Sequence, residues 1–237
     1  MTADEILHLF KLMLSYLPPT LKLFGFTLLY SIPLGMVVAL LKMCKFKPVS
    51  WLTNLYILIM RGTPLLLQII VVYYSVPTIR SNPHCPAFLQ NLLNGVELRG
   101  DAGVVYMFRM ILLAFVLNYA AYFAEIYRSG IQSMPVGQYE AAKLLGYSRS
   151  QTFFRILFPQ MVKRVMPPVT NEVITLVKDT SLAFALAYTE MFTMAKQIAA
   201  AQTSMVPYIA AGIFYYVFNL LVAMIMEKIE EKLNYYH

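Results

Sequence analysis

Long stretches without a charged residue limit the fold of this chain more than any other feature. Residues 24–41 and residues 207–226 are two of them. A helix rises about 1.5 Å per residue, so each stretch can cross the roughly 30 Å hydrocarbon core of a bilayer. Lipid offers no hydrogen bonds to an open backbone, so segments of this kind must be helical. The whole chain is 59% hydrophobic and 13% charged, against about 25% charged in soluble domains. We therefore predict an all-α membrane protein.

Three further apolar segments carry a few charges each and bring the number of predicted spans to five. They are residues 51–78, 102–124 and 165–188. Arg61 lies near the middle of the first of these, and Gly62 and Pro64 follow it directly. Glycine and proline loosen a helix, which is tolerated at membrane depth where a cavity is lined. The second and fourth spans are therefore the least certain to be single straight helices.

The loops predict which side of the membrane each end faces. Lysine and arginine gather after the first span and between the third and fourth spans, which places these loops in the cytoplasm. The N-terminus is then outside and the C-terminus inside. This asymmetry also accounts for the net charge of +7 without a nucleic-acid partner. Residues 1–19 predict a helix in the membrane interface ended by Pro18 and Pro19, residues 20–230 form the transmembrane domain, and residues 231–237 are a cytoplasmic tail.

Residues 135–160 form a polar, basic loop between the third and fourth spans, which we name the central loop. Gly146 can take the left-handed turn that ends a helix. Ser148 and Gln151 have the spacing of a capping box, which starts a new helix, and Pro159 is expected to end that helix or turn the chain back to the membrane. Ala141 and Ala142 keep one surface thin enough for a partner's groove. An amphipathic helix resting on lipid is the alternative from spacing alone.

The chain lacks the patterns of common catalytic sites. It has no GxxxxGK[ST] stretch to cradle ATP phosphates, no HExxH and no cluster of cysteine and histidine. We therefore expect no cofactor or metal in this chain and no enzymatic activity.

Four motifs resemble those of the permeases of ATP-binding-cassette (ABC) importers for polar amino acids. Glu140-Ala141-Ala142, Gly146, Ile156 and Phe158-Pro159 resemble the EAA loop, with Phe158 where the family pattern has Leu. Residues 61–68, RGTPLLLQ, resemble the signature of polar amino-acid permeases. The same family is indicated by residues 124–131, AEIYRSGI, and by Asn171-Glu172 followed by KDTSL at 178–182.

The resemblance implies a five-helix type I importer subunit in the inner or cytoplasmic membrane. It implies two ABC ATPase subunits that use ATP and magnesium, and a second permease, either the same chain or a sister. An extracytoplasmic binding protein would deliver the amino acid. The central loop would dock into a groove on the ATPase through Glu140, Ala141, Ala142, Gly146 and Pro159. Transport would then occur by alternating access.

The charges at membrane depth predict the substrate path, because such charges are costly unless they are paired or face a water-filled cavity. We expect Arg61, with Thr63 and Gln68, to bind an amino-acid carboxylate. A salt bridge from Arg61 to Glu125, Glu172 or Asp179 is the alternative. Lys178, Asp179, Thr180 and Ser181 form a second candidate, for binding or for gating, and a role in helix packing alone is the alternative.

Polar residues nearer the cytoplasm complete the predicted path. Asn171 and Glu172 lie where an inner gate is expected, and Asn118, Tyr122 and Glu125 approach the inner end of the third span. Contacts between helices are the alternative for the asparagine and tyrosines. The rival functions are a permease for another small solute and a channel or secondary carrier that needs no ATPase.

Overall fold

A computed structural model describes residues 3–93, 95–96, 98 and 100–233, and the regular structure in these residues is helical throughout. The helices run in the order α1 (Ala3–Ser15), α2 (Leu17–Lys42), α3 (Lys47–Gly62), α4 (Leu65–Ser81), α5 (Ala87–Leu93), α6 (Gly100–Gln132), α7 (Val136–Leu144), α8 (Arg149–Gln151), the π-helical η1 (Thr152–Leu157), α9 (Phe158–Asp179), the 3-10 helix η2 (Thr180–Leu186), α10 (Met191–Gln202) and α11 (Val206–Lys232). The last four residues of the predicted tail, 234–237, lie outside the described residues.

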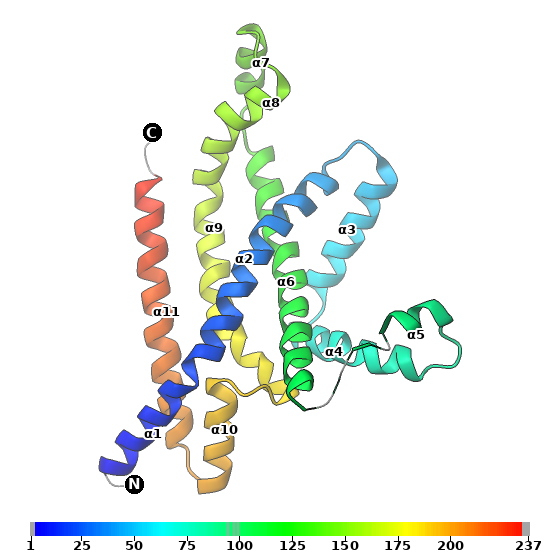
Figure 1. Cartoon of the computed structure of the whole chain (residues 1–237). Helices are drawn as coiled ribbons and strands as arrows, with labels where there is room; N and C mark the ends of the chain where they lie inside the picture. Colours follow the sequence, from blue (N-terminus) through cyan, green and yellow to red (C-terminus); the bar gives the residue numbers. More distant parts are fainter. Residues whose placement is uncertain (1–2, 94, 97, 99, 234–237) are drawn as a thin grey trace.

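Helix α6 is the centre of the fold, and α2, α3, α4 and α9 pack on it (Figure 1). Its inward side chains include Phe115, Tyr119 and Phe123, which are almost fully buried. The crossing with α2 is close because Gly35 has no side chain there. A Cβ at Gly35 would lie 2.7 Å from the Cβ of Phe123, well inside van der Waals contact. The α2–α6 pair therefore depends on a small residue, as is common between membrane helices.

Helix α1 leads into α2 with only a slight break, and the two helices form one long rod (Figure 1). The break falls at Tyr16, and Pro18 and Pro19 occupy the first turn of α2, where a missing N–H costs no hydrogen bond. Leu9 and Met13 of α1 are buried against α10 and α11. The expected apolar face of the first helix is therefore covered in part by protein. Its position in the membrane interface stays a prediction.

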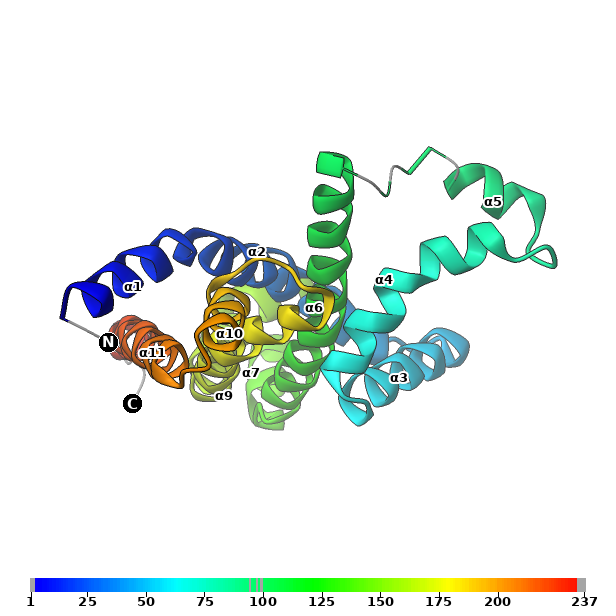
Figure 2. The same cartoon turned by 90° about the horizontal axis from the view of Figure 1, so that it is seen from below.

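The predicted second span is not one helix. Helices α3 and α4 meet at Thr63 and Pro64 and are bent by 114°. Helices α3 and α4 both pack on α6, and α4 then leads outward to α5, which lies away from the packed helices (Figure 2). The expected interruption after Arg61 is present, and it redirects the chain instead of only loosening a helix.

The boundaries of three predicted spans change. Helix α6 continues past residue 124 to Gln132, and α11 continues past residue 226 to Lys232, so most of the charged C-terminal sequence is helical. Helix α9 starts earlier than predicted, at Phe158, and its α-helical part ends at Asp179. By length and hydropathy, the described residues contain three helices able to span a membrane, or four if the bent α3–α4 pair counts as one. Helix α9 is not among them, because it carries ionisable side chains along its length.

Candidate functional site

The bend between α3 and α4 is held by side chains that replace a missing backbone donor. In a continuous helix the N–H of residue 64 would donate to the carbonyl of Met60, but Pro64 has no N–H. Two side-chain amides take its place. Gln68 Nε2 and Asn118 Nδ2 each donate to Met60 O at 3.0 Å. The bend is therefore anchored to α6 through Asn118.

Further hydrogen bonds close this network. Gln68 Nε2 also lies 3.1 Å from the carbonyl of Thr63 and 2.8 Å from its hydroxyl. Its Oε1 accepts from Asn118 Nδ2 at 3.0 Å. The Thr63 hydroxyl donates to Ile59 O at 2.8 Å. Three predicted binding or path residues, Thr63, Gln68 and Asn118, are thus brought together, and all three are engaged in the bend.

Arg61 lies in the last turn of α3 and faces a cleft of about 530 Å³. Its guanidinium lies 5.2 Å from the ring centroid of Tyr122 on α6, a distance typical of a cation–π contact. Glu172 of α9 and Glu125 of α6 also line this cleft. The predicted residues Arg61, Tyr122, Glu125 and Glu172 therefore share one cavity between three helices. Among the residues that the structure describes, Arg61 forms no ion pair with Glu125, Glu172 or Asp179, so the salt-bridge alternative is not realised.

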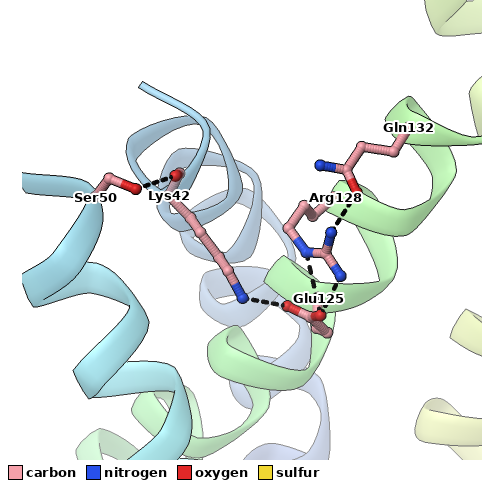
Figure 3. A network of polar contacts seen from close by, with 5 residues as sticks. All are labelled: Lys42, Ser50, Glu125, Arg128 and Gln132. Atoms are coloured by element: carbon pink, nitrogen blue, oxygen red, sulfur yellow. Dashed lines mark hydrogen bonds and ion pairs between the residues drawn. The ribbon is translucent and has the colours of Figure 1, made fainter. Parts of the chain in front are cut away.

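Glu125 is paired with two other cations (Figure 3). Lys42 Nζ of α2 lies 2.8 Å from Glu125 Oε2, and Arg128 donates through Nε and Nη2 to Glu125 Oε1. Arg128 also donates to Gln132 Oε1. Lys42 was not predicted as the partner, because 83 positions separate it from Glu125 and no local pattern links them.

The end of α9 gathers the second predicted group. Asp179 Oδ2 accepts from the hydroxyl of buried Tyr119 at 2.7 Å. The Thr180 and Ser181 hydroxyls donate to the carbonyls of Val177 and Lys178, each at 2.7 Å, which satisfies carbonyls that the helix end leaves open. Lys178 is exposed, and so is Asn171. Asp179 and Lys178 thus face different surroundings, and the chain changes there from α-helix to 3-10 helix.

The central loop has the predicted turn at Gly146. Gly146 has φ +75°, Tyr147 N donates to Ala142 O, and Gly146 N donates to Lys143 O. This pair of hydrogen bonds defines a Schellman motif. The capping box is also present, because Gln151 N donates to the Ser148 hydroxyl and Ser148 N donates to Gln151 Oε1. Helices α7 and α8 lie beyond the ends of the other helices (Figure 1).

Two expectations for the central loop are wrong. Pro159 does not end the second helix: η1 leads directly into α9, and Pro159 lies in the first turn of α9. The π-helical turn allows this, since Phe158 N donates five residues back to Phe153 O. Ala142 does not form part of a thin outer surface, because it is only 1% exposed and α7 packs on η1. Glu140 and Ala141 are exposed.

The outer surface of the central loop also exposes large apolar side chains. Leu144 is 89% exposed and Leu145 74% exposed. Val136 and Phe154 add further exposed apolar side chains. A projecting group of large apolar side chains is typical of a protein interaction site.

Glu190 is a buried carboxylate at a junction of helices, and the sequence analysis did not predict it as a site residue. It is 0% exposed and starts α10, where its carboxylate accepts from Phe192 N and from the N–H and hydroxyl of Thr193. It also accepts from Tyr215 of α11 at 3.0 Å and from Thr20 of α2 at 3.4 Å. Burial raises the pKa of Glu190, and the hydrogen bonds from Phe192 and Thr193 oppose that change. An acidic residue before a helix is a cap signal, but the contacts with α2 and α11 depend on the fold.

Comparison with known families matches residues 31–235 to the binding-protein-dependent transport system inner membrane component family. The chain belongs to this family. The resemblance seen in the EAA, RGTP and KDTSL motifs is thereby confirmed. This transport component is 32% identical to the L-cystine transport system permease protein TcyB of Bacillus subtilis, over 92% of this chain and 84% of that protein. It is 35% identical to the nopaline transport system permease protein NocM of Agrobacterium fabrum, over 99% and 92% of the two chains.

A solved structure agrees with the fold of this transport component. A chain in the crystal structure of an amino acid ABC transporter with histidines superposes with a TM-score of 0.79 at 28% identity. The match covers 98% of this chain and all of that chain. The type I importer fold expected from the motifs is therefore the fold observed.

Proposed function

We propose that this chain is the transmembrane permease subunit of an ABC importer for polar amino acids. It works with two ATPase subunits, a second permease subunit and an extracytoplasmic amino-acid-binding protein. ATP and magnesium are bound by the ATPase subunits. The family, its amino-acid-transporting relatives and the amino acid ABC transporter fold support this assignment.

We propose five membrane segments, made by α2, the bent α3–α4 pair, α6, α9 and α11. The helix directions support this arrangement (Figure 1). The last residues of α2, α6 and α11 lie at the same end of the molecule as the central loop. Most of the basic loop residues belong to this end, among them Lys42, Lys45 and Lys47. Because cytoplasmic loops are enriched in lysine and arginine, this end is inside the cell and the N-terminus is outside.

The observation that carries the proposal is the projecting central loop. Leu144 is the last residue of α7 and Leu145 is its C-cap, and both side chains are largely exposed. The Schellman turn and the capping box give the loop a defined shape, so a push on it can be transmitted. Helix α9 continues from the loop without a break through η1. Movement of the docked loop by the ATPase would therefore be passed directly to α9 and to Glu172 in the cleft.

We propose that the cleft of Arg61, Tyr122 and Glu172 is part of the substrate path. An amino acid carries a carboxylate and an ammonium group, and the cleft offers a cation and an anion on two different helices. Lys178 and Asp179 continue the path at the other end of α9. Thr63, Gln68 and Asn118 contribute by holding the bend that presents Arg61. Glu125 lines the same cleft but is held by Lys42 and Arg128.

Co-purification with the partner ATPase tests the proposal. The chain is expressed with its neighbouring transport subunits, and the ATPase retained on the tagged permease is measured. Leu144→Ser and Leu145→Ser together should abolish retention. Ile229→Ser is the matched control, because Ile229 is also an exposed apolar residue at the same end of the molecule, on α11. Transport by the reconstituted chain alone would support a channel or secondary carrier and overturn the proposal.

The substrate path has a separate test. Arg61→Ala is compared with wild type in proteoliposomes that contain the complete importer, with assembly checked by gel filtration. We expect a large loss of amino-acid uptake with an intact assembly. Unchanged substrate affinity and unchanged uptake would remove Arg61 from the path while leaving the ATPase coupling in place.

A further inference from the structure

A second cavity, of about 550 Å³, lies where the C-terminal ends of α2 and α6 meet the start of α3. Its volume is in the range of small-molecule sites. It is separate from the cleft of Arg61 and Glu172, because the two cavities share no lining residue. The transport path proposed above does not use it.

One face of α3 forms a wall of this cavity. Lys47, Ser50, Trp51 and Asn54 all line it, and their spacing of three, four and seven residues places them on one side of a helix. The Ser50 hydroxyl donates to Lys42 O at 2.6 Å, which ties the start of α3 to the end of α2. The wall therefore has a fixed position relative to the cations opposite it.

The cavity carries a net positive charge. Lys42 and Arg128 both line it, and they share the single carboxylate of Glu125 (Figure 3). With Lys47 included, three cations face one anion. An ammonium has three donors and a guanidinium five. Because Lys42 uses one donor on Glu125 and Arg128 uses three on Glu125 and Gln132, free N–H groups remain for a ligand. Glu125 holds the two cations in place without neutralising the site.

The surroundings of the cavity are apolar and exposed. Leu41 at the end of α2, Phe46 in the turn, and Leu52 and Leu55 on α3 are all exposed side chains. Trp51, in the cavity wall, is 67% exposed, and tryptophan is enriched where membrane helices meet the headgroup layer. A ligand in this cavity would thus have its polar part among cations and its neighbouring part against lipid-facing side chains.

We propose that this cavity binds the phosphodiester headgroup of an anionic phospholipid, such as phosphatidylglycerol. Lys42, Lys47 and Arg128 contact the phosphate, Ser50 and Asn54 offer further polar groups, and the acyl chains lie along α2 and α3. Basic pockets between helices at the cytoplasmic side are known lipid-binding features. The charge selects an anionic head, and the exposed apolar border selects a lipid over a soluble phosphate.

The chain provides its own reporter, because Trp51 is its only tryptophan. The full chain is reconstituted in phosphatidylcholine vesicles with a varied fraction of phosphatidylglycerol. Bromine on the acyl chains of one lipid at a time quenches tryptophan fluorescence on contact. We expect brominated phosphatidylglycerol to quench Trp51 with an apparent affinity at least about fivefold above that of brominated phosphatidylcholine, since one cation near the headgroup layer is worth about that factor.

Two lysine variants locate the effect. Lys47→Ala should lower the preference for phosphatidylglycerol by about fivefold. Lys45→Ala removes the same charge two residues away but does not line the cavity, so it should leave the preference within about twofold of wild type. Equal quenching by the two lipids in wild type would overturn the proposal. Equal loss in both lysine variants would also overturn it, by showing attraction to the whole basic loop.

A soluble ligand is distinguished in the same vesicles. Inorganic phosphate at millimolar concentration should leave the quenching by brominated phosphatidylglycerol unchanged. Full displacement of the lipid by inorganic phosphate would assign the cavity to a soluble phosphate and overturn the lipid assignment. Amino-acid transport is not measured in this experiment, so its outcome is independent of the proposed function.

Discussion

The hydrogen bonds at the bend between α3 and α4 predict how much stability is lost when two side chains are replaced. Gln68 and Asn118 both donate to Met60 O and also bond to one another. Each is replaced by leucine, singly and together, to remove the amide and keep an apolar side chain of similar size. The question is whether the two losses add.

Two effects oppose each other in the double variant. The direct Gln68–Asn118 hydrogen bond is lost in each single variant but only once in the double variant. The sum of the two single losses therefore counts it twice and exceeds the loss in the double variant by about 0.6 kcal/mol, the value of such a bond between membrane helices. Met60 O keeps one donor in each single variant and loses both only in the double variant. An unsatisfied buried carbonyl costs about 1–3 kcal/mol. The second effect is larger, so the double variant should lose about 0.4–2.4 kcal/mol more than the sum of the singles.

Thermal unfolding in detergent measures this difference. With roughly 2–4 °C per kcal/mol for a chain of this size, each single variant at about 1 kcal/mol should shift Tm by about 2–4 °C. The double variant should exceed the sum of the two shifts by about 1–10 °C. Leu67→Ala is the control, because Leu67 lies next to the bend, is exposed and takes no part in its side-chain hydrogen bonds, so its Tm should stay near wild type. Additive or smaller losses would refute the reasoning that these amides replace the donor missing at Pro64.

Two further predictions concern the central loop and Glu190. Gly146→Ala forces a Cβ into a left-handed turn at a cost of about 1–2 kcal/mol and should speed hydrogen–deuterium exchange in α7. The control is Gly137→Ala, which lies within α7 with open space around it and should slow exchange there. Equal exchange rates in the two variants would contradict the role of the turn. Because burial raises the pKa of Glu190, the folded chain keeps this proton to higher pH than the unfolded chain, so the carboxyl's contribution to stability falls as pH rises above about 4.5. Glu190→Gln should lower Tm at every pH, because it breaks the α10 cap. Its Tm should nevertheless fall less with rising pH than the Tm of wild type. Parallel Tm profiles would show that the pKa of Glu190 is the same in the folded and unfolded chains.

Local signals in the sequence predicted local structure well. The turn at Gly146 and the capping box of Ser148 and Gln151 are present because each depends only on residues within one or two helical turns. The interruption after Arg61 is present for the same reason, since Pro64 removes a donor wherever it stands. The angle of the bend was beyond prediction, because it depends on the hydrogen bond from Asn118 on another helix.

Long-range contacts were the weaker part of the prediction. Lys42 reaches Glu125 and Thr20 reaches Glu190 only because α2 crosses the molecule beside α6 and past the start of α10. The prediction that Pro159 ends a helix was wrong because it rests on the behaviour of proline inside an α-helix, and a π-helical turn precedes this residue. Ala142 was misread because its burial depends on η1 folding back onto α7. Each error concerns a side chain whose surroundings come from a distant or irregular segment.

The same bend explains why Arg61 forms no ion pair with a carboxylate in the part of the chain that the structure describes. Ending α3 at Gly62 places Arg61 in the last turn of the helix, where the open carbonyls carry a partial negative charge that favours a cation. The ring of Tyr122 adds a second favourable contact at 5.2 Å. These two contributions stabilise the guanidinium without a salt bridge, so its N–H groups stay available in the cleft. Pro64, Gln68 and Asn118 thus act on the proposed substrate path indirectly, because they create the helix end at which Arg61 lies.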